Sequence, residues 1–214
     1  MMREAGSRDM TDVYIEKGTR RVFACAVDWP GWCRSGKTEE AALEALGAST
    51  ARYAAIAKRA RVPFDASTPA RFSVKERLAG SMTTDFGAPG SIPRSDRRTL
   101  SSAEAVRIAE LLEASWAFLD NLLKKAPARL RKGPRGGGRD RDEIGRHVIE
   151  AEDAYARKVG VRIKDPAARR NAMLEAIRSG SAEIPEKGWP LRYAARRTAW
   201  HAIDHAWEIE DRSE

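Results

Sequence analysis

The apolar residues in the first third of the chain alternate with polar residues over short stretches, a pattern typical of β-strands. Val13 and Ile15 fall on one face of the first stretch and Tyr14 on the other. The second stretch is a continuous apolar run, which favours a strand covered on both faces. Four strands are predicted, over residues 12–17, 22–27, 32–35 and 72–79.

A helix is predicted between the third and fourth of these strands. Thr38 offers a hydroxyl cap, and Glu39 and Glu40 place negative charge at the positive end of the helix dipole. Apolar residues then recur at helical spacing to about Lys58, at Leu43, Leu46, Tyr53 and Ile56. The region therefore predicts a small ββ(β)αβ unit.

From residue 101 onward the apolar residues recur only every three to four positions, which predicts helices throughout. Ser101 with Glu104 forms a capping box, and Asp140 with Glu143 starts another helix in the same way. The predicted helices cover residues 101–126, 140–160, 165–180 and 189–211. Four amphipathic helices with short connections predict a helix bundle.

The two regions are separated by a stretch rich in glycine, proline, serine and aspartate, with few apolar residues. Such a stretch buries too little apolar surface to offset the entropy lost on ordering. We therefore predict a two-domain α+β protein. Residues 11–82 form a small α+β domain, residues 83–100 a linker and residues 101–214 the helix bundle.

The net charge of +8 leaves nucleic acids and other anions open as partners. Residues 52–98 carry ten basic and four acidic side chains, and residues 124–141 carry eight basic side chains against Asp140 alone. Both stretches also fit an ordinary solvated helix end and a flexible loop. Charge alone therefore does not choose between a binding surface and a solvated one.

The apolar runs are only a few residues long, whereas a membrane-spanning helix needs about 20. The first ten residues alternate in charge and lack the apolar core of a secretory signal. Cys25 and Cys33 are too few for a disulfide framework. We therefore expect a cytoplasmic protein without membrane contact.

The chain contains three histidines, and all of them fall on predicted bundle helices. His201 and His205 are four residues apart, so both side chains leave the same face of the last helix. His147 lies on the apolar face of the second helix, where a bundle turns it inward. Three neutral imidazoles can hold a divalent metal and leave a position for water or substrate. The alternative is a metal-free bundle whose histidines are packed and hydrogen-bonded.

Carboxylates accompany these histidines. Glu150 follows His147 by three residues, and Glu208 follows His205 at the same spacing. Together with Asp204, these side chains are candidates to orient an imidazole ring or to accept a proton. Imidazole ligands suit several divalent ions, of which we predict zinc or nickel. The two cysteines do not have zinc-ligand spacing.

Two segments resemble one protein family. DEIGRHVIEAEDAYARKVG (142–160) resembles the second helix of DinB-like proteins, and WPLRYAARRTAWHAIDHAWEIEDR (189–212) resembles their last helix. The resemblance implies a four-helix bundle, often dimeric, with a divalent metal held by His147, His201 and His205. Some members use a low-molecular-weight thiol as cosubstrate. The resemblance thus implies a metal-dependent enzyme that transfers a thiol to an electrophile. The basic loop 129–141 is then a candidate to attract an anionic thiol.

The N-terminal segment VFACAVDWPGWCRSGKTEEAALEAL (22–46) resembles the core of HicB-like domains. Antitoxins with this fold bind a small ribonuclease partner and often carry a DNA-binding module. The bundle occupies the place of such a module here. The second hypothesis is therefore a non-catalytic protein whose N-terminal domain recognises a small protein or nucleic acid, with the bundle as a structural or sensor partner.

Overall fold

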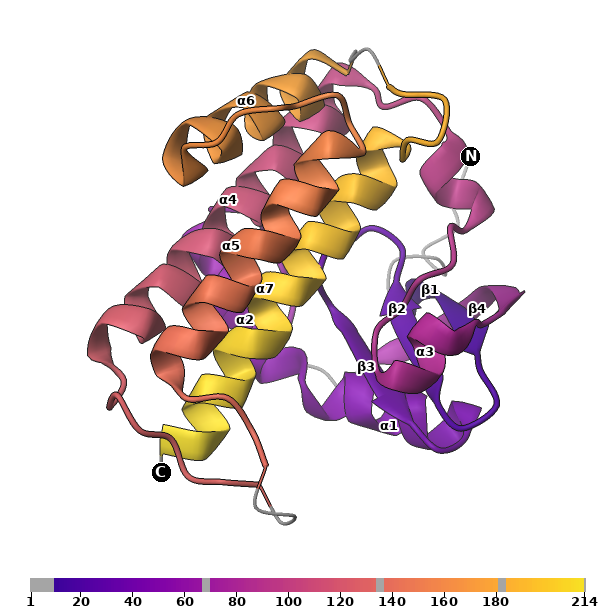
Figure 1. Cartoon of the computed structure of the whole chain (residues 1–214). Helices are drawn as coiled ribbons and strands as arrows, with labels where there is room; N and C mark the ends of the chain where they lie inside the picture. The colour runs from indigo at the N-terminus through magenta and orange to yellow at the C-terminus, as the bar shows by residue number, and fades with distance from the viewer. Residues whose placement is uncertain (1–9, 67–69, 134–136, 181–183, 214) are drawn as a thin grey trace, which may run out of the picture.

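The computed structural model describes residues 10–66, 70–133, 137–180 and 184–213, which form an α+β fold with a small N-terminal sheet beside a set of helices (Figure 1). The strands are β1 (Met10–Lys17), β2 (Val22–Ala26), β3 (Cys33–Gly36) and β4 (Arg71–Ala79). The described residues also contain seven α-helices: α1 (Glu39–Ala48), α2 (Thr50–Arg59), α3 (Met82–Phe86), α4 (Ser102–Lys125), α5 (Arg141–Arg157), α6 (Pro166–Ser179) and α7 (Leu191–Ser213).

The four predicted strands form one sheet in the order β3-β2-β1-β4. β1 pairs antiparallel with β2 and parallel with β4, so both edges of this strand are hydrogen-bonded within the sheet. Val13 and Ile15 pack in one apolar cluster with residues of α1 and α2. Tyr14 packs in another with Phe23 and with Trp200 of α7. The predicted alternation along β1 is thus confirmed.

The helix predicted over residues 38–58 is two helices, because the chain breaks at Ser49 between α1 and α2. The Ser49 hydroxyl donates to the carbonyl of Leu46 at 2.7 Å and accepts from the indole Nε1 of Trp32 at 3.0 Å. Trp32 is fully buried, so its N–H needs an acceptor inside the protein. The break supplies that acceptor.

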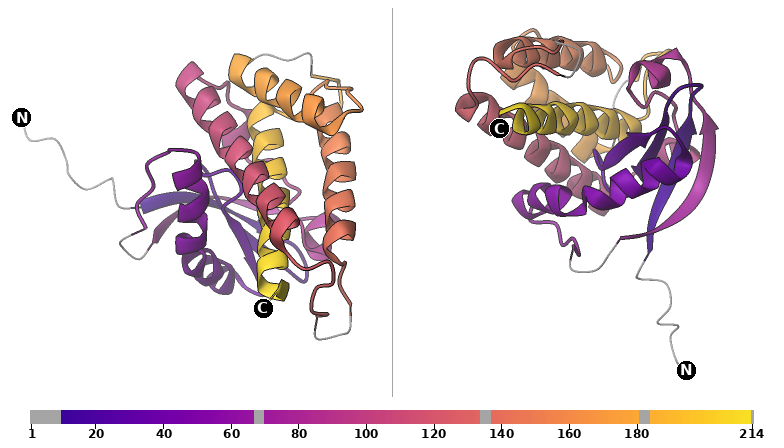
Figure 2. Two further views of the ribbon diagram at one scale, coloured as in Figure 1. Left: turned by 90° about the vertical axis from the view of Figure 1, so that its left-hand side faces the viewer. Right: turned by 90° about the horizontal axis from the view of Figure 1, so that it is seen from below.

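The four helices predicted after residue 101 are confirmed as α4 to α7, with Ser101 and Glu104 forming the capping box of α4. α7 runs through the middle of the molecule, with α4 and α5 on one side and the sheet on the other (Figure 1; Figure 2). α6 lies across one end of α4 and α5. This central position explains why nearly the whole first half of α7 is buried.

The residues predicted as a linker, 83–100, are fastened to both regions. Glu16 is fully buried at the end of β1 and accepts hydrogen bonds from the backbone N–H of Gly90 at 2.8 Å and of Ser91 at 2.9 Å. Asp96, also fully buried, pairs with Arg196 of α7 at 2.7 Å. Polar anchoring thus holds a segment that has few apolar residues. That the two regions fold as separate domains stays a prediction.

The sheet and the bundle also share apolar core. Ile203 and Trp207 of α7 belong to the same buried cluster as Trp32. The turn before β3 lies directly on α7: Gly31 has a φ of 88°, and a Cβ there would meet the Ile203 side chain at 2.5 Å. Only glycine satisfies both the backbone conformation and this close approach.

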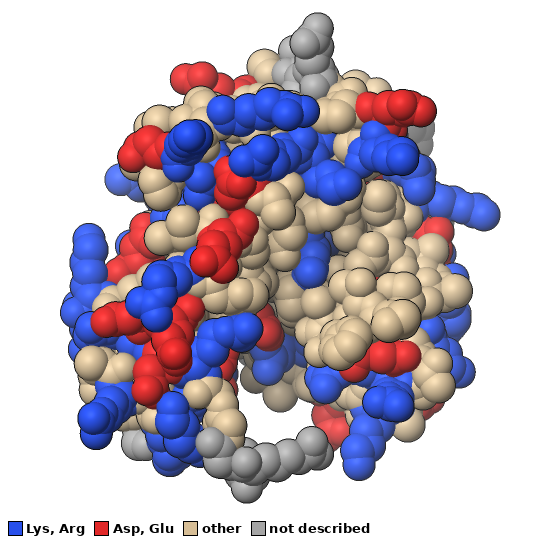
Figure 3. All heavy atoms as spheres, in the orientation of Figure 1, with Lys and Arg blue, Asp and Glu red and all other residues tan. Residues whose placement is uncertain are grey.

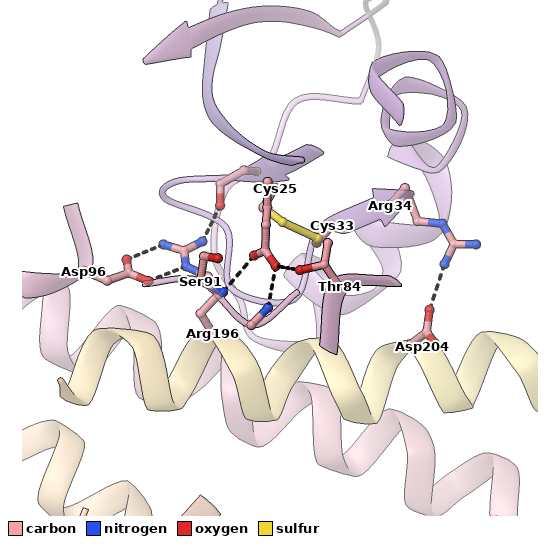
Figure 4. The surroundings of a disulfide bond; sticks show 11 residues. Cys25, Cys33, Arg34, Thr84, Ser91, Asp96, Arg196 and Asp204 are labelled. Atoms are coloured by element: carbon pink, nitrogen blue, oxygen red, sulfur yellow. Dashed lines mark hydrogen bonds and ion pairs between the residues drawn. A yellow bond between two sulfur atoms is a disulfide. The ribbon is translucent and has the colours of Figure 1, made fainter. Parts of the chain in front are cut away.

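Cys25 and Cys33 occupy opposed positions on β2 and β3 and form a disulfide bond, which the sequence analysis did not predict. Figure 4 shows the bond near α7, between the Asp96–Arg196 ion pair on one side and the Arg34–Asp204 pair on the other. Within the described ranges, none of the helices combines the length and apolar character required to cross a bilayer.

Candidate metal centre

α5 and α7 lie side by side and position the three histidines (Figure 1). Ile144 and Val148 are buried on α5, and this face of the helix turns His147 toward α7. On α7, His201 and His205 project from one face a single turn apart. The structure therefore brings together all three predicted side chains, from two helices.

The three imidazoles converge on one point. One ring nitrogen from each histidine lies within 4.8 Å of the other two. Nε2 of His147 and Nε2 of His201 are 3.2 Å apart. Two nitrogens bound to one zinc ion at about 2.0–2.1 Å in tetrahedral geometry lie about 3.3–3.4 Å apart. The cluster, formed largely from buried side chains, could therefore hold a metal ion.

Burial favours the neutral form of two of these rings, His147 and His201. Burial lowers the pKa of His201 to about 2, helped by the nearby charges of His205 and Arg197. Burial also lowers the pKa of His147, with a further contribution from Arg139. Because a metal binds the deprotonated ring nitrogen, both histidines are in the binding form at neutral pH.

Glu208 is the predicted carboxylate that contacts a histidine. Its Oε2 accepts a hydrogen bond from Nδ1 of His205 at 2.8 Å, and its Oε1 pairs with Arg212 at 2.5 Å. Burial raises the pKa of Glu208, but these two partners outweigh it and hold that pKa below its usual value. The contact fixes Nδ1 of His205 as a donor and leaves its Nε2 as the nitrogen available to a metal.

The other two predicted carboxylates are placed differently. Asp204 forms an ion pair with Arg34 of β3 at 3.3 Å. Glu150 is exposed on α5 and acts on His147 only through its charge, in the direction that raises the pKa of that ring. Their predicted catalytic roles stay predictions, because neither side chain contacts a histidine in the described chain.

A groove of about 690 Å³ opens between β3, α7 and the loop that joins α4 to α5, and it reaches the site through Glu208, the partner of His205. It is lined by Asp204 and Glu208, which flank His205 in the sequence, and by Arg131 and Lys132 of the loop. Figure 3 shows that this face of the molecule is hollowed between the helices and the sheet. Residues 134–136 of the predicted basic loop 129–141 lie outside the described residues, as do residues 1–9 of the segment examined for a signal.

Four of the ten basic side chains of residues 52–98 form ion pairs with carboxylates of the described chain. Arg52 contacts Glu210 at 2.8 Å, and Arg77 contacts Glu39 at 2.7 Å. Lys75 and Arg94 also form ion pairs. Protein or nucleic acid recognition by the N-terminal region stays a prediction.

Two residues that the sequence analysis missed lie next to the histidines. The Tyr155 ring is 5.7 Å from that of His201. The Arg197 guanidinium lies over two aromatic rings. It is 4.6 Å from the centroid of the Trp200 ring and 5.5 Å from the centroid of the Tyr155 ring. The spacing of Arg197 and His201, four residues apart on one helix face, was the available signal.

Comparison of the chain with known protein families, with curated proteins and with solved structures gave no match.

Proposed function

We propose that the protein is a metal-dependent enzyme in which His147, His201 and His205 hold one divalent ion, zinc or nickel. The observation that carries this proposal is the convergence of three ring nitrogens within 4.8 Å of one another. Lone pairs that face each other at this separation repel, and a shared cation turns the repulsion into attraction. The lowered pKa values of His147 and His201 favour the same neutral, ligating form.

A metal-free arrangement accounts for less of the geometry. A hydrogen bond between the Nε2 atoms of His147 and His201 satisfies one pair of rings. His205 uses Nδ1 in its hydrogen bond to Glu208, and a ring nitrogen of His205 also lies within 4.8 Å of that pair. One cation satisfies all three nitrogens together.

The reaction we propose is the transfer of a low-molecular-weight thiol to an electrophile, as the resemblance to DinB-like proteins implies. When bound, the metal would lower the pKa of a thiol or water and supply a nucleophile at neutral pH. Three protein ligands leave room for that molecule. In this proposal Glu208 holds His205 in position, and the groove admits the substrates. Arg131 and Lys132 attract an anionic thiol to the groove.

Elemental analysis of protein purified without a histidine tag or chelator tests the metal centre. We expect about one divalent ion per chain in the wild type and a loss of most of it in His147→Ala and in His201→Ala. Glu150→Gln is the control, since this exposed side chain lies near His147 without contacting it. Circular dichroism checks that each variant is folded. Wild-type protein that contains no metal, and whose melting temperature does not change with added Zn²⁺ or Ni²⁺, would overturn the proposal.

The thiol reaction is tested on the metal-loaded protein. A panel of low-molecular-weight thiols is assayed against a chromogenic electrophile, with the metal-depleted protein as the blank. We expect turnover that is lost in His201→Ala and retained in Glu113→Gln, whose side chain pairs with Arg178 on the surface. Turnover equal to the blank for every thiol would contradict this reaction while leaving the metal centre intact.

A further inference from the structure

Arg197 is a buried cation without an anionic partner. Only 9% of the residue is exposed, and its Nη1 atom is buried without a hydrogen-bond partner. No carboxylate among the described residues forms an ion pair with it. Two fully buried carboxylates, Glu16 and Asp96, act through their charges on Tyr193, which is close to Arg197 in the sequence. Both already have partners: Glu16 accepts from backbone N–H groups, and Asp96 pairs with Arg196.

An unpaired buried guanidinium is unfavourable, because burial removes its hydration and no anion replaces it. The other buried arginines of α7 illustrate the contrast. Arg192 pairs with Glu104 at 2.8 Å, and Arg196 pairs with Asp96 at 2.7 Å. Arg197 instead lies against the faces of Trp200 and Tyr155, which stabilise the cation but leave its N–H donors unused.

The position of Arg197 relates it to the histidine cluster. Arg197 and His201 are four residues apart on α7, so they share a helix face one turn apart. Tyr155 contacts both residues. The Arg197 guanidinium lies over the Tyr155 ring, and the centroids of the Tyr155 and His201 rings are 5.7 Å apart. A small molecule held at Arg197 would therefore lie one helical turn from His201.

We propose that Arg197, walled by Tyr155 and Trp200, binds the carboxylate of a small organic acid whose other end reaches the histidine cluster. A carboxylate fits because its two oxygens match the planar fork of guanidinium donors. The substrate role of this site rests on the proposed metal centre, but binding of the anion does not. The carboxylate belongs either to the thiol or to the electrophile.

The primary test uses metal-free protein, so that its result is independent of the metal centre. Binding of propionate is measured by ligand-observed NMR, with propionamide as the neutral analogue. We expect propionate to bind the wild type, propionamide to bind at least tenfold more weakly, and Arg197→Gln to lose at least tenfold in propionate affinity. Arg178→Gln is the matched control, because Arg178 has the same charge and pairs with Glu113 on the surface at 2.9 Å.

The source of the carboxylate is tested on zinc-loaded protein with 3-mercaptopropionate. Binding at least tenfold tighter than to metal-free protein, and dependent on Arg197, would assign the carboxylate to the thiol. Binding that depends on Arg197 but gains nothing from zinc would assign it to the electrophile. Either result supports the subsite.

Stability separates the subsite from a purely structural arginine. If Arg197 is an unpaired cation awaiting a ligand, Arg197→Gln melts no lower than the wild type, and propionate raises the melting temperature of the wild type alone. Propionate that fails to bind metal-free wild type, or that binds Arg197→Gln equally well, would overturn the proposal even if the protein holds metal.

Discussion

Glu208 and His205 are joined by a hydrogen bond of 2.8 Å between Oε2 and Nδ1, within one turn of α7. Carboxylates that orient a ligating histidine in this way typically contribute about 10–100-fold to metal affinity. We therefore expect Glu208→Gln to weaken zinc binding by about 10–100-fold while the protein stays folded. Competition with a chromogenic chelator measures the affinity.

Glu150→Gln is the control for this prediction, because it removes the same charge from an exposed position on α5. An equal loss of affinity in both variants would show that Glu208 acts through overall charge and not through His205. Unchanged affinity in Glu208→Gln would remove Glu208 from the site.

The ion pair between Asp96 and Arg196 gives a second prediction, on stability. Both side chains are buried, and the guanidinium also donates to the carbonyls of Ala26 and Val27 at the end of β2. Removing one partner of a buried pair leaves an uncompensated charge and typically costs about 3–5 kcal/mol. Asp96→Asn should lower the free energy of unfolding by that amount in urea titrations.

A matched surface pair provides the comparison. Glu113 and Arg178 lie 2.9 Å apart with both side chains largely in solvent. Exposed pairs contribute about 0–1 kcal/mol, so Glu113→Gln should change the unfolding free energy little. Similar losses in the two variants would mean that the Asp96 pair does not fasten the segment after β4 to α7.

Most of the secondary structure was predictable because its signals are local. The capping boxes of Ser101 with Glu104 and of Asp140 with Glu143 set helix starts within a few residues, and the structure shows both. The convergence of the histidines also followed from a local signal. The four-residue spacing of His201 and His205 fixes a shared face, and the apolar stripe around His147 turns it inward.

The way residues 83–100 are held in the fold could not be predicted, because it depends on contacts between residues far apart in the sequence. Glu16 is joined to Gly90 across 74 residues, and Arg196 to Asp96 across 100. No short window of sequence contains both members of such a pair, so residues 83–100, which supply Gly90 and Asp96, resembled a solvated linker. Arg197 was missed for a different reason, because its four-residue spacing from His201 was a local signal. An arginine on an amphipathic helix predicts a surface position unless the aromatic rings that cover it are known.

The disulfide bond between Cys25 and Cys33 gives a third prediction. It closes a loop with a sequence separation of 8 residues, for which chain entropy alone contributes about 2–3 kcal/mol. We expect non-reducing peptide mapping to find the two cysteines linked. The linked protein should then be more stable than Cys25→Ala/Cys33→Ala by about 2–3 kcal/mol in urea titrations. Peptides that alkylate fully without reductant would contradict the linkage.

The histidine cluster gives a fourth prediction, on the pH dependence of stability without metal. Burial lowers the pKa of His201 to about 2, whereas an unfolded histidine titrates near about 6.5. Between these two values the unfolded state binds more protons than the folded state. Stability therefore falls as the pH decreases below about 6.5, by up to about 1.4 kcal/mol per pH unit for each such histidine.

The variant His201→Gln isolates this contribution, because glutamine does not titrate. Urea titrations of metal-free protein between about pH 5 and 7.5 should give a slope of unfolding free energy against pH that is lower in the variant. His147, whose pKa is also lowered by burial, titrates in both proteins, so its contribution cancels in the comparison. Below about pH 6 the two slopes should therefore differ by nearly one proton, which is about 1.4 kcal/mol per pH unit. Parallel slopes would mean that His201 is solvated and protonates freely in the folded state. A ring so exposed would not be held in the neutral form that binds the metal.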